Sequence, residues 1–160
     1  MQNTTLDTFL ATTYTTSQIK RRLTALQFFL NSKIFGGTKS LTNIVVKDQY
    51  WIGSLGDNFF NAFNKKTISK ELRELGEDLQ KVPVLTILVP VELPEDKLSE
   101  LGAWVRDQFK KQLILEVKIN PGLIGGCALI WKGVYKDYSV KASIQVQQKE
   151  ILGNFKRYLK

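Results

Sequence analysis

The chain has 160 residues, 43% of them hydrophobic, and a net charge of +8, which suits one ordinary globular domain or two small ones. No apolar run approaches the roughly 20 residues that cross a bilayer, and the threonine-rich N-terminus lacks the basic start and apolar centre of a secretory signal. The single cysteine, Cys127, excludes an internal disulfide and favours a reducing compartment. We therefore expect a cytosolic chain.

The positive charge is spread along the sequence. Residues 1–82 hold 11 basic and 7 acidic side chains, and residues 83–160 hold 12 and 8, so each part carries +4. An acidic partner or a nearby membrane surface would suit this excess. A protein that binds specific nucleic-acid sequences usually has its basic residues clustered on one face instead.

Helical periodicity dominates the first part. One helix is predicted from Thr15 to Ser17, which offer N-cap oxygens, up to the glycine pair at 36 and 37. A looser pattern over 41–63 breaks near Gly53 and Gly56, and the clearest helix covers 67–81. Apolar stripes on several helices must be buried against one another, which predicts a small bundle. The stripe positions are Ile19, Leu23, Leu26, Leu30 and Ile34 in the first helix and Ile68, Leu72, Leu75 and Leu79 in the last.

The periodicity of the hydrophobic residues changes at Pro83. VPVLTILVP, residues 82–90, is typical of a strand buried on both faces. A helix with a first turn at Pro94 follows, and LILEVKI, residues 113–119, returns to alternation. A strand, a helix and a strand of these lengths predict a right-handed parallel crossover. The helix stripe is Leu98, Leu101, Val105 and Phe109, and one side of the second strand is Leu113, Leu115, Val117 and Ile119.

The remaining residues predict a hairpin and a final helix. CALIWKGVYK, residues 127–136, is a strand that turns at Lys132 and Gly133, and Ser139 can cap the helix that follows. The apolar face of that helix is Val140, Ile144, Ile151, Phe155 and Leu159. The fold class is therefore predicted as α+β in two parts: a helical N-terminal bundle over 5–82 and a small α/β domain with a mixed sheet over 83–160.

The stretch INPGLIGGC, residues 119–127, separates the second strand from the hairpin. Its NPG sequence breaks the strand, and Leu123 and Ile124 offer two apolar anchors that would fix the loop in the core. Gly125 and Gly126 permit positive φ or a close backbone approach. Taken alone, the two glycines are most simply explained as a bulge or turn in a hairpin.

The order of features from Val84 to Ile151 resembles the C-terminal domain of the delta subunit of F-type ATP synthases, the family of the mitochondrial oligomycin-sensitivity-conferral protein. The family has an acid-Pro-x-Leu-Ile-Gly-Gly signature and, at a fixed spacing, an Asp-Gly-Ser-Val element before the last helix. The first stands here as Asn120, Pro121, Gly122, Leu123, Ile124, Gly125 and Gly126, and the second as Asp137, Tyr138, Ser139 and Val140.

The sequence departs from the family pattern at a few positions. Asn120 stands for aspartate, Tyr138 for glycine and Lys136 for a commonly apolar residue, and the hairpin glycine falls one place late, at Gly133. These departures affect the expected turn geometry. The residues before 83 match the family only in being helical, and they form a shorter bundle.

The resemblance implies a stator subunit that joins the catalytic head of a proton-translocating ATP synthase to its membrane-anchored stalk. The helical part would hold the head, with the N-terminal helix of an alpha subunit in a groove, and the α/β part would hold b-type stalk helices. This role involves no catalysis, cofactor, metal or nucleic acid, so the motif residues are expected to be structural. The expected location is the cytoplasmic side of the plasma membrane, reached only through the complex.

Rival sites have weaker support. The chain lacks histidine, the commonest general base and metal ligand, and Cys127 in an apolar strand is expected to be buried and inert. GGTKS at 36–40 differs from a phosphate loop in glycine spacing and follows a helix, so helix capping explains it better. An RNA-binding module is the alternative, because Trp131, Tyr135 and Tyr138 stand near lysines and strand aromatics can stack on bases.

Overall fold

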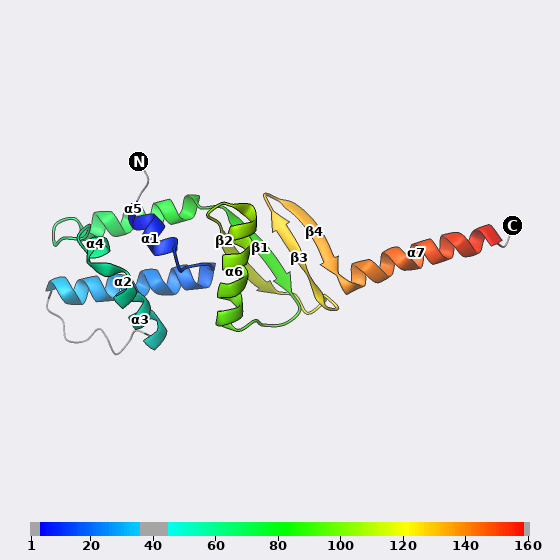
Figure 1. The fold of residues 1–160 in the computed structure, drawn as a ribbon, viewed down its shortest axis with the longest axis horizontal. Coiled ribbons are helices and arrows are strands. Elements are labelled where there is room, and N and C mark those ends of the chain that lie inside the picture. Colours follow the sequence, from blue (N-terminus) through cyan, green and yellow to red (C-terminus); the bar gives the residue numbers. More distant parts are fainter. Residues whose placement is uncertain (1–3, 36–44, 159–160) are drawn as a thin grey trace. The chain divides into compact units, whose positions relative to one another are not determined.

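The computed structural model describes residues 4–35 and 45–158, and it has the predicted α+β order of helices followed by a sheet with helices (Figure 1). The seven helices and four strands of these residues are α1 (Thr4–Leu10), α2 (Thr16–Phe35), α3 (Val46–Ser54), α4 (Gly56–Phe60), α5 (Ile68–Lys81), β1 (Val84–Val89), α6 (Glu95–Phe109), β2 (Ile114–Ile119), β3 (Gly126–Trp131), β4 (Val134–Ser139) and α7 (Val140–Tyr158). The short helix α1 is an addition to the sequence prediction.

The chain divides into two compact units. The first contains Met1–Pro83 and Leu98–Ile114, and the second contains Val84–Lys97 and Leu115–Lys160. The sequence placed a single boundary between residues 82 and 83. In the structure, most of α6 is grouped with the N-terminal helices, because its polar face contacts the connection between α1 and α2.

The core of the first unit is one apolar cluster. The ring of Phe9 meets Trp51 edge-on at 5.2 Å between centroids, an arrangement that favours aromatic pairs. The cluster comprises Phe9, Leu10, Ile19, Ala25, Leu26, Leu30, Trp51, Ile52, Leu55, Phe59, Phe63, Ile68, Leu75, Leu79, Val82 and Ile114. Most predicted stripe positions are therefore buried as expected. The side chain of Ile34, and residues 36–44 with the predicted glycine cap, lie outside the described part of the structure.

The sheet of four strands has the order β2-β1-β3-β4. The strand β3 pairs antiparallel with both β1 and β4. The amide of Ile114 donates to the carbonyl of Pro83 at 2.9 Å, and that of Asn120 donates to Val89 at 2.7 Å. In both hydrogen bonds the donor and the acceptor are separated by the same number of residues along the chain, so β1 and β2 run parallel. The sheet is therefore mixed.

The hairpin between β3 and β4 turns where the sequence predicted. Lys132 has φ 49° and Gly133 has φ 79°, as both central residues of a type I′ turn require, and Trp131 pairs with Val134 across it. Here the lysine accepts a left-handed conformation that glycine adopts more readily.

Burial along the first two strands differs from the prediction. In β1, Leu85, Ile87 and Val89 are buried while Val84 is exposed, so the strand is not covered on both faces. In β2 the expected alternation fails: Ile114 is buried like its two neighbours, and Ile119 is exposed. Ile114 is buried because it belongs to the apolar cluster of the first unit, whereas Ile119 is not a member of that cluster.

Candidate functional site

The loop between β2 and β3 is fixed by its own asparagine. The side-chain oxygen of Asn120 accepts a hydrogen bond from the amide of Gly122 at 3.0 Å, and its carbonyl accepts one from Leu123 at 3.1 Å. An Asx turn of this kind needs only a side-chain oxygen acceptor, which asparagine supplies as well as the family's aspartate. Leu123 is buried, as predicted, but Ile124 is 63% exposed, so the prediction that both anchor the loop is wrong for Ile124.

The glycine pair serves two different purposes. Gly125 has φ +72° and Gly126 has φ +74°, a region that L side chains rarely adopt. The carbonyl of Gly125 accepts a hydrogen bond from the amide of Val140, the first residue of α7, at 3.3 Å. Gly126 lies against the backbone of Tyr138 and Ser139, where a Cβ atom would clash. The pair therefore seats the loop on the junction between β4 and α7.

Asp137 and Ser139 stabilise the same junction. The amide of Ser139 donates to Asp137 at 2.8 Å, and the hydroxyl of Ser139 accepts from the amide of Ala142 at 3.2 Å, which is an N-cap. The pKa of Asp137 lies below its usual value because Ser139 donates hydrogen bonds to the carboxylate. The side chain of Ser139 has the larger effect and its backbone amide the next. Of the motif residues, Asn120, Leu123, Gly125, Gly126, Asp137 and Ser139 thus act together, whereas Pro121 and Ile124 face solvent.

The helix that this junction directs, α7, leaves its apolar side chains uncovered. It runs on from the end of β4 (Figure 1). Its predicted apolar face is exposed along its length at Val140, Ile144, Ile151 and Phe155, with individual side chains between 45% and 63% accessible. A series of large apolar side chains on one exposed helical face is typical of a protein-binding surface. The last predicted member, Leu159, lies outside the described residues.

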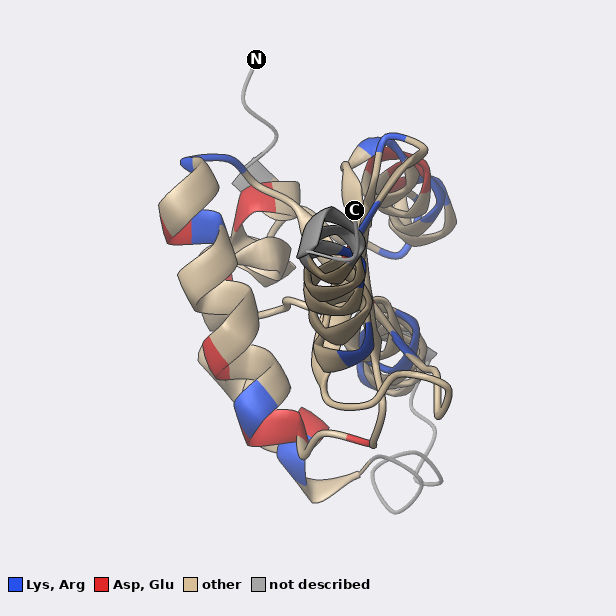
Figure 2. Cartoon of the chain, turned by 90° about the vertical axis from the view of Figure 1, so that its right-hand side faces the viewer, with Lys and Arg blue, Asp and Glu red and all other residues tan. Residues whose placement is uncertain are grey.

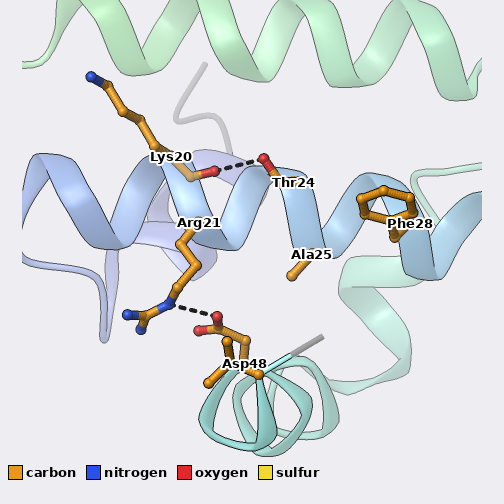
Figure 3. Close-up of a pocket in the computed structure, with 7 residues that line it drawn as sticks. Lys20, Arg21, Thr24, Ala25, Phe28 and Asp48 are labelled. Atoms are coloured by element: carbon orange, nitrogen blue, oxygen red, sulfur yellow. Dashed lines mark hydrogen bonds and ion pairs between the residues drawn. The ribbon is translucent and has the colours of Figure 1, made fainter. Parts of the chain in front are cut away.

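A groove lies between α2 and α3 in the first unit. It encloses about 310 Å³ and is lined by Lys20, Arg21, Thr24, Ala25, Phe28, Val45 and Asp48. Figure 3 shows Arg21 reaching from α2 to Asp48 on α3, with Ala25 and Phe28 further along α2. Phe28 is half-exposed in this groove and Val45 is exposed at its edge. Although four of these residues are polar, most of the surface that lines the groove is apolar, so an apolar side chain would fit there.

Asp48 at the floor of this groove is almost completely buried, with 1% of its side chain accessible. The Nε atom of Arg21 donates to its Oδ2 at 2.6 Å, and the Nε of Arg22 lies 3.8 Å from its Oδ1. The guanidinium of Arg22 also lies 4.8 Å from the ring centre of Trp51. These two arginines offset the cost of burying the carboxylate. This ion cluster was not predicted from the sequence, although the adjacent arginines of α2 were a signal for it.

The candidates for other chemistry do not converge on a site. Cys127 is half-buried, so the predicted full burial is wrong. Over residues 4–35 and 45–158 no group of three His, Cys, Asp or Glu side chains could hold a metal ion. The GGTKS sequence lies outside the described residues. Figure 2 shows Lys and Arg scattered over helices and loops with Asp and Glu between them.

The exposed aromatics of β4 do not share one face. Residues that pair across the hairpin lie on the same face, so Tyr138 shares a face with Cys127 and Tyr135 shares the other with Ile130. Because Tyr135 and Tyr138 project to opposite sides of the sheet, they do not form a common platform for stacked bases. The register therefore divides the three aromatics of the RNA-binding alternative between the two faces, with Trp131 and Tyr138 on one and Tyr135 on the other.

The comparisons with known proteins agree with this arrangement. The family model described as ATP synthase delta (OSCP) subunit matches residues 63–151. Since this is more than half of the sequence, the chain belongs to the ATP synthase delta (OSCP) subunit family. It is also 23% identical over 112 residues to the ATP synthase subunit delta of Dichelobacter nodosus (strain VCS1703A). That alignment covers 61% of this chain and 61% of the relative. No helix in the described ranges has the length and apolarity that a membrane crossing demands.

Proposed function

We propose that the chain is the delta-type stator subunit of an F-type, proton-translocating ATP synthase. It would connect the catalytic head to the peripheral stalk and resist the torque of the rotor, without catalysing a reaction or binding a cofactor. The observation that carries this proposal is the family match over residues 63–151, which includes the loop and the junction that direct α7. As part of the complex, the chain would lie on the cytoplasmic side of the plasma membrane and meet the membrane only indirectly.

We assign the stalk contact to the C-terminal part, residues 83–160, and to α7 in particular. Its exposed apolar face suits a b-type stalk helix that packs alongside it. Between residues 140 and 158 the sequence has four basic side chains, Lys141, Lys149, Lys156 and Arg157, against one acidic side chain, Glu150. This excess would attract and orient an acidic stalk helix.

We assign the head contact to the N-terminal helices within 5–82. The groove between α2 and α3 combines an apolar lining with the exposed ring of Phe28. It would accept side chains from the apolar face of an amphipathic helix, such as the N-terminal helix of an alpha subunit. Two separate contacts with one assembly raise the effective concentration of each, so moderate interfaces can give firm attachment.

Two charge substitutions on α7 test the stalk contact. Phe155 and Val146 are 63% and 62% exposed, and nine helical positions place them about 180° apart around the helix. If the apolar face binds the stalk, Phe155→Asp weakens binding to a purified stalk domain by about tenfold or more. Val146→Asp, the matched control, changes it by less than about twofold. Equal effects of the two substitutions in calorimetric titration would contradict the assignment.

Affinity purification from the source cells tests the function itself. The tagged chain should bring down head and stalk subunits of the ATP synthase together. Recovery of neither, combined with retention on immobilised RNA at physiological salt, would favour the RNA-binding alternative over the stator.

A further inference from the structure

The helix α6 has a polar face that was not predicted from its periodicity. Ser99, Gly102 and Arg106 are spaced by three and four residues, so they lie along one side of the helix. Each of them contacts α2 or the connection between α1 and α2. All of these residues belong to the first unit. We call this set of contacts the α6 seam.

Arg106 makes the most extensive contacts in the seam. Its guanidinium donates to the carbonyl oxygens of Leu10 at 2.5 Å, Thr13 at 2.6 Å and Leu113 at 2.8 Å. It also lies 4.7 Å from the ring centre of Tyr14. Leu10 is the last residue of α1, where helix carbonyls lack partners in their own helix. The planar fork of arginine can bond several such carbonyls at once, which a lysine cannot do.

Burial lowers the pKa of Arg106 from its usual value. An arginine nevertheless stays charged in proteins. Its hydrogen bonds to the carbonyls are therefore charge-assisted and stronger than bonds between neutral groups.

Two further contacts hold α6 close to α2 and to the connection between α1 and α2. A Cβ atom on Gly102 would overlap the side chain of Tyr14, with only 2.8 Å to its Cγ atom. The side-chain Nε2 of Gln18 donates to the hydroxyl of Ser99 at 3.0 Å, and the side-chain Oε1 of Gln18 accepts from the backbone amide of Tyr14 at 2.9 Å. The absence of a side chain at Gly102 is what permits this approach, since any Cβ there would displace the tyrosine.

The seam bears on the path that a mechanical load takes along the chain. The helix α6 begins at Glu95 in the second unit and continues into the first unit from Leu98, and β2 returns to the second unit after Ile114. A pull on α1 and α2 can reach α6 directly through the seam, in addition to the packing of both helices against α5 and the covalent chain through α3, α4 and α5.

We propose that the α6 seam is a mechanical joint that fastens the α1–α2 connection to α6, with Arg106 as its positioning residue. The joint itself is a property of the chain, whereas its role in transmitting torque rests on the proposed stator function. If the seam were only general core packing, replacing Arg106 would lower stability everywhere in the first unit. If it is a joint, the loss is concentrated at residues 10–18.

Hydrogen–deuterium exchange of the full chain tests the joint. In Arg106→Gln, amide exchange over residues 10–18 should rise by about tenfold or more, while β1 and β3 keep their protection. Arg106→Lys should give an intermediate rise, because a point charge replaces the fork. The matched control is Arg73→Gln, at a residue with 72% of its side chain exposed, and it should leave residues 10–18 unchanged.

Unchanged exchange over 10–18 in both Arg106 variants would overturn the joint. So would a uniform rise over the whole first unit. If Arg106→Gln does not fold, Gly102→Ala displaces Tyr14 while keeping the guanidinium, and the same local rise is then expected.

The role of the joint in transmitting torque is tested in the whole enzyme. In vesicles that contain the assembled ATP synthase, Arg106→Gln should lower the protons pumped per ATP hydrolysed by about twofold, with head and stalk still co-purifying. Unchanged pumping in a variant whose amide exchange has risen would overturn the role in transmitting torque. Failure of the wild-type chain to assemble with the enzyme would instead overturn the stator function and leave the exchange result intact.

Discussion

The backbone of Gly126 approaches the carbonyl oxygen of Tyr138 so closely that a Cβ atom on the glycine would lie 2.5 Å from it. At Gly125, by contrast, the nearest neighbour of such an atom would be a methyl group of Val140 at 3.3 Å. Both glycines have positive φ, so strain alone does not distinguish them. What distinguishes them is whether the neighbouring atom can move.

The glycine pair gives the first prediction. Gly126→Ala should lower the free energy of unfolding by about 3 kcal/mol, because a backbone carbonyl cannot move aside. Gly125→Ala should cost only about 1 kcal/mol, the usual penalty for positive φ, since the side chain of Val140 can rotate. Urea denaturation of the two variants measures the difference. Equal costs would mean that the close approach to Tyr138 has little effect.

The two apolar residues of the loop give a second pair of variants. Leu123 is 7% exposed and Ile124 is 63% exposed. We expect Leu123→Ala to cost about 2 to 3 kcal/mol by leaving a cavity, and Ile124→Ala to stay within about 0.5 kcal/mol of wild type. Thermal unfolding followed by circular dichroism is sufficient to rank them. A larger loss at Ile124 would show that it is buried in solution.

The buried carboxylate of Asp48 should be a main determinant of stability in the first unit. Asp48→Asn removes the negative charge between Arg21 and Arg22, and we expect it to cost about 3 kcal/mol. Glu77→Gln breaks an exposed pair with Arg73 and should cost less than about 1 kcal/mol. Both variants are compared by urea denaturation with the intrinsic fluorescence of Trp51 as one signal. Similar costs would contradict the burial of Asp48.

The junction before α7 should respond to acid through Asp137. Its pKa in the folded chain is lowered from the usual 3.8, so its stabilisation is complete above that value and is lost as pH falls through the lowered pKa. The free-energy difference between wild type and Asp137→Asn should therefore stay constant above about pH 5 and shrink at lower pH. Unfolding measured at a series of pH values checks this. A difference that grows on acidification would show that the pKa of Asp137 is raised in the folded chain instead of lowered.

The elements that follow periodicity were predictable from the sequence. The amphipathic pattern of 67–81 and the Lys132–Gly133 turn appear at the expected residues, since both depend on local chemistry. The motif also indicated which glycines have unusual backbone conformations. These features require no knowledge of distant contacts.

The features that depend on distant contacts were not predictable. Ile124 continues an apolar run, yet its exposure is set by the Asx turn at Asn120, which buries only Leu123. Arg106 is one basic residue among many in the sequence, and only folding brings it to the carbonyls of Leu10 and Thr13. Likewise, nothing in the periodicity of α6 showed that a side chain at position 102 would collide with Tyr14.

The end position of β4 in the sheet has a consequence for contacts between separate copies of the chain. An outermost strand presents unpaired backbone groups that can recruit a strand from another molecule, and charged side chains discourage such recruitment. β4 carries Lys136 and Asp137 at its centre, on its two opposite sides. These charges therefore guard the free chain against fibre-like aggregation at this edge.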